Sequence, residues 1–156
     1  MLLDTHALLW YLTDDKQLPK EIRDQISRQN LVYVSAAVIW EIAIKGSLGK
    51  LEYGVKPITS RRVMDEIVAE CVSQEFQFLD ISPSHASQAP FFVSDHKDPF
   101  DRLLAAQAIQ QGMILVSRDA AFDGFSPNIR RLWAGTSAPA TAPPKKRAAK
   151  ATKKVP

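Results

Sequence analysis

The chain has 156 residues, of which 46% are hydrophobic and 24% are charged. This length and composition support one folded core and exclude a collagen, a coiled coil and a wholly disordered chain. No apolar stretch approaches the roughly 20 residues of a membrane-spanning helix, and no basic cluster of a secretory signal leads the chain, so we expect a cytoplasmic protein without a membrane partner. The single cysteine, Cys71, excludes an internal disulfide and a cysteine-rich metal site.

Charge divides the chain into two regions. Residues 136–156 consist mainly of Ala, Pro, Thr and Lys, and they carry six basic side chains and no acid. The whole chain has a net charge of +3, so the part before residue 136 is mildly acidic. Residues 1–135 keep 14 basic and 17 acidic side chains, a net charge of −3. We therefore predict a folded domain over residues 1–135 and a disordered basic tail over 136–156. The tail would bind phosphates weakly through residues such as Lys145, Lys146 and Arg147.

Short apolar runs alternate with amphipathic segments along residues 1–135, which is typical of an α/β domain with a mostly parallel sheet. Strands are predicted at residues 1–3, 31–35, 76–82 and 113–117, with a short fifth strand at 129–133. Helices are predicted at residues 7–12, 19–28, 36–48, 60–74 and 98–111, with a short one after Pro83. The helix at 98–111 has the clearest ends, because Asp98 suits its N-cap, Pro99 its first turn and Gly112 its end.

Four acidic residues stand at the carboxyl ends of these strands or on the adjoining helices. Asp4 ends the first strand, and Glu41 lies in the helix after the second. Asp101 begins the helix that enters the fourth strand, and Asp119 follows that strand. The carboxyl ends of parallel strands line the ligand crevice of such sheets, and ionised carboxylates in apolar surroundings are costly unless a cation lies between them. A site made of carboxylate oxygens, without His or Cys ligands, favours a hard divalent cation, so we predict that it binds Mg²⁺ or Mn²⁺.

Each acid also has a structural interpretation. Glu41 and Lys45 have the i,i+4 spacing of a weak helical ion pair, worth ~0.3–0.5 kcal/mol. Asp98 and Asp101 suit a helix N-cap and an acid in the first turn, and Asp119 suits the cap of the next turn. Four such coincidences at one edge of one sheet favour the metal site, with Asp98 kept in the supporting role of a cap.

Other candidate residues carry weaker signals. Arg102 and Arg118 adjoin two of the acids and are candidates for weak RNA binding, although solvation at the surface explains them equally well. No pair of histidines has a metal-binding spacing, and His85 and His96 are expected to be surface or packing residues. The three tryptophans lie in apolar runs and are expected in the core: Trp10, Trp40 and Trp133.

Four segments resemble the PIN-domain ribonucleases, most closely the VapC toxins of VapBC toxin–antitoxin systems: LLDTHALLW, WEIAIK with LGKL, HKDPFDRLLAAQA and VSRDAAF. They occur in the family's order over roughly residues 1–135. The resemblance implies a three-layer α/β fold with a central, mostly parallel sheet of four or five strands flanked by helices. It places the family's acidic metal site on Asp4, Glu41, Asp101 and Asp119, and it puts Thr5 and Ser117 at hydroxyl-bearing positions that support that site.

The same resemblance implies a Mg²⁺- or Mn²⁺-dependent endoribonuclease that acts as the toxin of a toxin–antitoxin pair. Hydrolysis of its RNA substrate, for which transfer RNA is a candidate, would leave a 5′-phosphate and a 3′-hydroxyl. A cognate VapB-like antitoxin and a homodimer are also expected. The alternative is a catalytically weak PIN-like module that binds RNA or protein with affinity from its basic tail. A phosphotransferase with Asp4 as nucleophile is disfavoured, because His6 stands where that chemistry needs a second Asp.

Overall fold

The computed structural model describes residues 1–133, and the tail predicted at 136–156 lies outside the described residues. In this described part of the chain, five strands form one sheet that is parallel throughout, in the order β5-β2-β1-β6-β7. This confirms the predicted α/β class and parallel sheet. The strands are β1 (Leu2–Leu3), β2 (Tyr33–Ser35), β5 (Gln77–Leu79), β6 (Ile114–Val116) and β7 (Arg130–Leu132).

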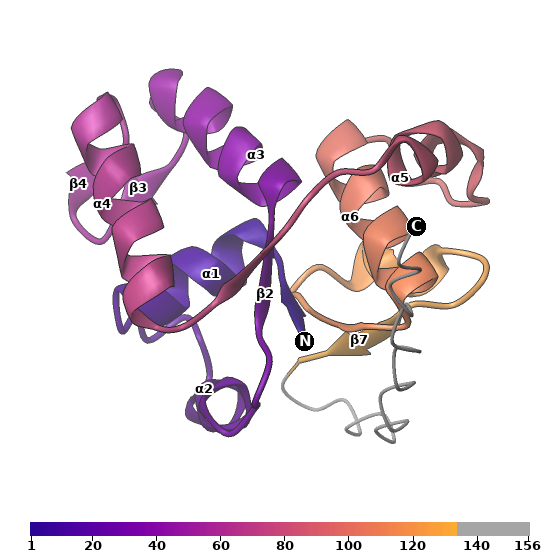
Figure 1. Ribbon diagram of the computed structural model, residues 1–156, viewed down its shortest axis with the longest axis horizontal. Coiled ribbons are helices and arrows are strands. Elements are labelled where there is room, and N and C mark those ends of the chain that lie inside the picture. Colours follow the sequence, from indigo (N-terminus) through magenta and orange to yellow (C-terminus); the bar gives the residue numbers. More distant parts are fainter. Residues whose placement is uncertain (134–156) are drawn as a thin grey trace, which may run out of the picture.

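Within residues 1–133, six α-helices flank the sheet. Figure 1 shows α1 to α4 on one side of the view and α5 and α6 on the other, with β2 between them. Each predicted helix is present, with ends shifted by a few residues. Within residues 1–133, no helix is long and apolar enough to cross a membrane. The helices are α1 (Thr5–Leu12), α2 (Lys20–Ser27), α3 (Ala36–Ser47), α4 (Arg61–Ser73), α5 (Pro83–Gln88) and α6 (Pro99–Gln111).

Three short features were not predicted from the sequence. A two-residue antiparallel pair, β3 (Glu52–Tyr53) with β4 (Lys56–Pro57), forms a hairpin between α3 and α4. Two 3₁₀ turns, η1 (Ala89–Phe91) and η2 (Ala120–Gly124), follow α5 and β6. Elements this short carry no periodic hydrophobic pattern, so the sequence offers no signal for them.

The core lies between the sheet and its helices. Both residues of β1 are fully buried, and Trp10 of α1 and Cys71 of α4 lie in the same cluster, as predicted. The prediction for Trp40 is wrong, because its side chain is 54% exposed. Trp40 lies on α3, where its ring and the Phe100 ring form a T-shaped pair with a centroid separation of 5.0 Å.

Helix α6 is fixed at both ends and in its middle. The Asp98 carboxylate accepts a hydrogen bond from the Phe100 amide at 2.9 Å, and Gly112 ends the helix with a positive φ of 62°. In the middle, the buried Gln107 side chain accepts a hydrogen bond from the Ser35 hydroxyl and donates one to the Asp80 carbonyl at 3.2 Å. These two bonds tie α6 to the carboxyl ends of β2 and β5.

A glycine in α3 allows the closest approach between this helix and the segment that follows the hairpin. A Cβ atom at Gly46 would lie 2.6 Å from the Ile58 carbonyl oxygen and 2.8 Å from its Cβ. We expect Gly46→Ala to lower the free energy of unfolding by about 1–2 kcal/mol despite the better helix propensity of alanine. Urea unfolding measures this, with the exposed Ser47→Ala as a control that should change stability by less than about 0.5 kcal/mol. An unchanged or more stable Gly46→Ala would contradict the packing argument.

Candidate metal centre

The candidate site lies where the strand order of the sheet reverses. From β1 the chain proceeds outward through β2 and β5, and it then returns to build β6 and β7 on the other side of β1. Open parallel sheets bind ligands at the carboxyl ends of the strands at such a point. A cavity of about 370 Å³ lies there, and its lining residues are Asp4, His6, Arg118, Asp119 and Ala120.

Asp4 is the N-cap of α1 and is only 7% exposed. Its carboxylate accepts hydrogen bonds from the Ala7 amide at 2.6 Å and from the Ser117 hydroxyl. Burial raises the pKa of Asp4 to about 7, and the negative charges of Asp101 and Glu41 add to that rise, while the two hydrogen bonds oppose it. Asp4 is therefore a buried carboxyl group whose ionised form lacks a cationic partner among residues 1–133.

Glu41, on α3, is also buried and is held on both carboxylate oxygens. Its Oε2 accepts a hydrogen bond from the Thr5 hydroxyl, and its Oε1 forms the predicted ion pair with Lys45. The Lys45 ammonium also reaches Asp98 at 3.3 Å. Burial lowers the pKa of Lys45, but the two carboxylates outweigh burial and raise it on balance, so the lysine stays charged. Lys45 thus links α3 to the start of α6.

Asp101, in the first turn of α6, is paired with a residue that the sequence analysis did not select. His96 Nε2 lies 2.6 Å from Asp101 Oδ2, and the His96 ring packs against the rings of Phe122 and Phe125. Burial raises the pKa of Asp101, the hydrogen bond from His96 opposes that rise, and the charges of Asp98 and Glu41 reinforce it.

Asp119 differs from the other three acids because it is exposed. It caps η2 by accepting a hydrogen bond from the Ala121 amide at 2.8 Å, which is the structural role its sequence position suggested. Its own amide donates to the Ser117 hydroxyl at 3.0 Å, so Ser117 connects Asp119 to Asp4. Ligand atoms of three residues lie within 4.8 Å of one another: His96, Asp101 and Asp119.

The geometry therefore brings the four predicted acids to one edge of the sheet, in two parts. Asp101 and Asp119 form a close group with His96, and Asp4 adjoins it across the shared cavity and through Ser117. Glu41 faces the same region, since its charge acts on both Asp4 and Asp101. Carboxylate oxygens gathered in this way, with burial raising the pKa of Asp4 and of Asp101, are the chemistry that suits a hard divalent cation. The residues present thus fit Mg²⁺ or Mn²⁺.

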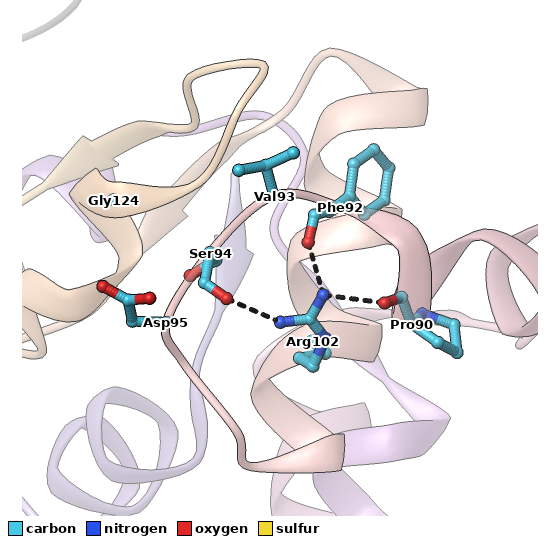
Figure 2. Close-up of a pocket in the computed structure, with 7 residues that line it drawn as sticks. All are labelled: Pro90, Phe92, Val93, Ser94, Asp95, Arg102 and Gly124. Atoms are coloured by element: carbon cyan, nitrogen blue, oxygen red, sulfur yellow. Dashed lines mark hydrogen bonds between the residues drawn. The ribbon is translucent and has the colours of Figure 1, made fainter.

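The two arginines singled out from the sequence have different surroundings. Figure 2 shows the Arg102 guanidinium directed into the segment that carries Pro90, Phe92 and Ser94, beside a cavity of about 520 Å³. Arg102 donates five hydrogen bonds to backbone carbonyls, those of Ala89, Pro90, Phe92, Ser94 and His96. Arg118 instead lies over the Trp10 ring, 4.7 Å from its centroid. The basic residues predicted in the tail lie outside the described residues.

The Asp4 carboxyl group makes the stability of the metal-free protein depend on pH. The pKa of about 7 in the folded state lies above 3.8, the value for the unfolded chain, so the folded protein holds the proton more tightly. The stability from this proton is complete below the unfolded pKa and is lost as pH rises through the folded pKa. From about pH 5 to about pH 8, we expect wild type to lose about 2–3 kcal/mol of unfolding free energy relative to Asp4→Asn. Parallel pH profiles of urea unfolding in EDTA would contradict this assignment.

Three comparisons place the chain among known proteins. Ribonuclease VapC22 of Mycobacterium tuberculosis is 26% identical over 120 residues, which are 76% of this chain and 86% of VapC22. The crystal structure of VapBC2 from Rickettsia felis, bound to a DNA fragment from their promoter, has a chain with the same fold. That likeness has a TM-score of 0.56 at 14% identity and covers 82% of this chain and 94% of the other. The sequence pattern of the PIN domain matches residues 1–126, and the chain therefore belongs to the PIN domain family.

Proposed function

We propose that this PIN domain is a divalent-metal-dependent endoribonuclease and the toxin of a toxin–antitoxin pair. The observation that carries the proposal is the buried Asp4 carboxyl group, which shares a cavity with Asp119 and has no cationic partner within residues 1–133. Nothing in the packing around Asp4 requires an acid, since an amide oxygen would cap α1 equally well. Retaining a carboxylate there is a cost to stability that a bound cation would offset.

In this proposal Asp4, Asp101 and Asp119 hold the metal through carboxylate oxygens, with Glu41 beside them. When bound, a divalent cation supplies positive charge to the phosphate and lowers the pKa of a water molecule. The protein's part is to fix the donors. The Ala7 amide and Ser117 hydroxyl orient Asp4, and the Thr5 hydroxyl and Lys45 ammonium orient Glu41. Hydrolysis of an RNA phosphodiester is the reaction that this arrangement supports, in agreement with the name of the M. tuberculosis relative.

A protein partner is the second part of the proposal. Helix α3, which carries Glu41, and its C-cap residue expose an apolar stripe at i, i+4 and i+8. The stripe consists of Trp40, Ile44 and the C-cap Leu48, which are 54%, 37% and 62% exposed respectively. Such a stripe next to an active site suits an antitoxin segment that covers both. The structure from R. felis, in which VapBC2 is bound to promoter DNA, supports a VapB-like antitoxin as that partner. A homodimer and a cytoplasmic location, where RNA substrates are present, belong to the same proposal.

The proposed activity depends on both the acids and the metal. We expect Asp4→Asn and Glu41→Gln each to slow cleavage of total cellular RNA by at least about 100-fold in Mg²⁺ or Mn²⁺, because each removes a negative oxygen from the site. EDTA should stop the wild-type reaction. Electrophoresis of the RNA after timed incubation measures these rates.

The matched control for this assay is Asp65→Asn, which makes the same chemical change on the exposed face of α4, where Asp65 pairs with Arg61. It should cleave at the wild-type rate, whereas any contaminating ribonuclease would show as residual cleavage in the Asp4→Asn preparation. If Asp4→Asn and Asp65→Asn cleave equally fast in metal, the nuclease proposal is wrong.

His96 is expected to act through Asp101. Its hydrogen bond fixes one oxygen of that carboxylate, so His96→Ala should weaken Mn²⁺ binding by roughly 10-fold without unfolding the protein. Isothermal titration of Mn²⁺ into the full-length variant measures the affinity, and circular dichroism checks the fold. His96→Gln, which keeps a hydrogen-bonding side chain, should recover part of the loss. Equal Mn²⁺ affinity in wild type and His96→Ala would remove His96 from the site.

A further inference from the structure

An acidic site that cleaves RNA must also attract a polyanion. Five carboxylates lie at this edge of the sheet, those of Asp4, Glu41, Asp98, Asp101 and Asp119. One or two divalent cations would neutralise part of that charge, but the phosphates that flank the cleaved bond lie outside the reach of the metal. An RNA strand bound here therefore needs positively charged side chains beside the site. The basic residues within 1–133 can be compared for this role.

Three of the basic side chains around the site are already committed. The Lys45 ammonium pairs with Glu41 and Asp98. A guanidinium has five N–H groups, and Arg102 donates all five to the backbone carbonyls named above. Arg131 lies on β7, the strand next to β6, and forms a bidentate pair with Asp123. Binding a phosphate with any of these would break interactions that hold the site together.

Arg118 is in a different situation. It follows Ser117 at the carboxyl end of β6 and is exposed, and within residues 1–133 it forms no ion pair with a carboxylate. Its guanidinium carbon lies over the Trp10 ring, 4.7 Å from the ring centroid. A cation–π contact of this kind forms no hydrogen bond, so it leaves the guanidinium N–H groups available to a bidentate acceptor such as phosphate. Trp10 is itself buried, so the platform under Arg118 is rigid.

Arg118 also stands between two cavities. It lines the cavity of about 370 Å³ with Asp4 and Asp119, and it lines a second of about 340 Å³ that extends along α1 to the loop at Lys50 and Gly54. His6 and Arg118 are common to both linings, so the two hollows adjoin at these residues. An RNA strand whose cleaved phosphate lies among the acids would continue past Arg118 into the second cavity.

We propose that Arg118, which lies over Trp10, binds the RNA phosphate next to the one that is cleaved and directs the strand into the cavity along α1. This inference rests on the proposed function and adds to it the residue that recognises the backbone. Contact with a phosphate carries no base preference, so Arg118 contributes affinity and position rather than sequence specificity.

The test compares full-length Arg118→Gln, Arg118→Lys and Arg28→Gln. Arg28 is an exposed arginine at the end of α2, ahead of β2 and so at the amino edge of the sheet, which makes its substitution a matched loss of one charge. Two measurements are made: kcat and KM for cleavage of a labelled single-stranded RNA, and the Kd of the same RNA by fluorescence anisotropy in an Asp4→Asn background that prevents cleavage. The Kd is measured at several salt concentrations.

Arg118→Gln should raise KM and Kd by about 5–20-fold with kcat within about 2-fold, because it removes a ground-state contact. The slope of log Kd against log salt should fall by about 0.7, the contribution of one phosphate contact to a single strand. Arg118→Lys should keep most of that slope, and Arg28→Gln should match wild type.

Unchanged Kd and salt slope in Arg118→Gln would overturn the inference, and so would a loss confined to kcat, since that result assigns Arg118 to the acidic site alone. Failure of the proposed function looks different. In that case wild type does not cleave the RNA in any metal, while the dependence of Kd and salt slope on Arg118 still decides whether this residue binds phosphate.

Discussion

The burial of the Asp4 carboxyl group at the end of β1 is the constraint on which the rest of the site depends. Removing an ionised carboxylate from water costs several kcal/mol unless it is fully compensated. The structure compensates Asp4 only in part, with the Ala7 amide, the Ser117 hydroxyl and the N-terminus of α1. The remaining cost appears as the raised pKa of Asp4.

The Lys45 ammonium pairs with two acids near the site, and Asp4 is not one of them. Lys45 binds Glu41 on its own helix and Asp98 at the start of α6, 53 residues further along the chain. Together with the bonds that Gln107 makes to Ser35 and the Asp80 carbonyl, this contact fixes α6 against α3 and the sheet. The acids therefore come from elements that are distant in sequence but mechanically joined, and this rigidity is what a metal site with few protein ligands requires.

The alternation of apolar and amphipathic segments was sufficient to predict the parallel sheet and the main helices, because strands buried on both faces and capped helices such as α6 leave local signals. Comparison with known proteins confirms the fold and the family. The roles of the four acids stay predictions. His96 was missed because it approaches Asp101 through a loop whose path depends on Arg102, and no spacing rule encodes that path. Trp40 was misplaced because an apolar residue on a helix reads the same whether it faces the core or an exposed stripe.

The five carbonyls bound by Arg102 also affect how the molecule opens. Withdrawal of that one guanidinium removes all five hydrogen bonds at once and leaves the segment with the Val93–Ser126 bridge. Residues 89–96 should therefore detach as a cooperative unit, and because Arg102 follows Asp101 directly on α6, the same event would disturb the Asp101–His96 pair. Amide hydrogen exchange in this segment and occupancy of the site by a cation are thus thermodynamically linked, and a ligand at Asp101 would protect backbone that it never touches.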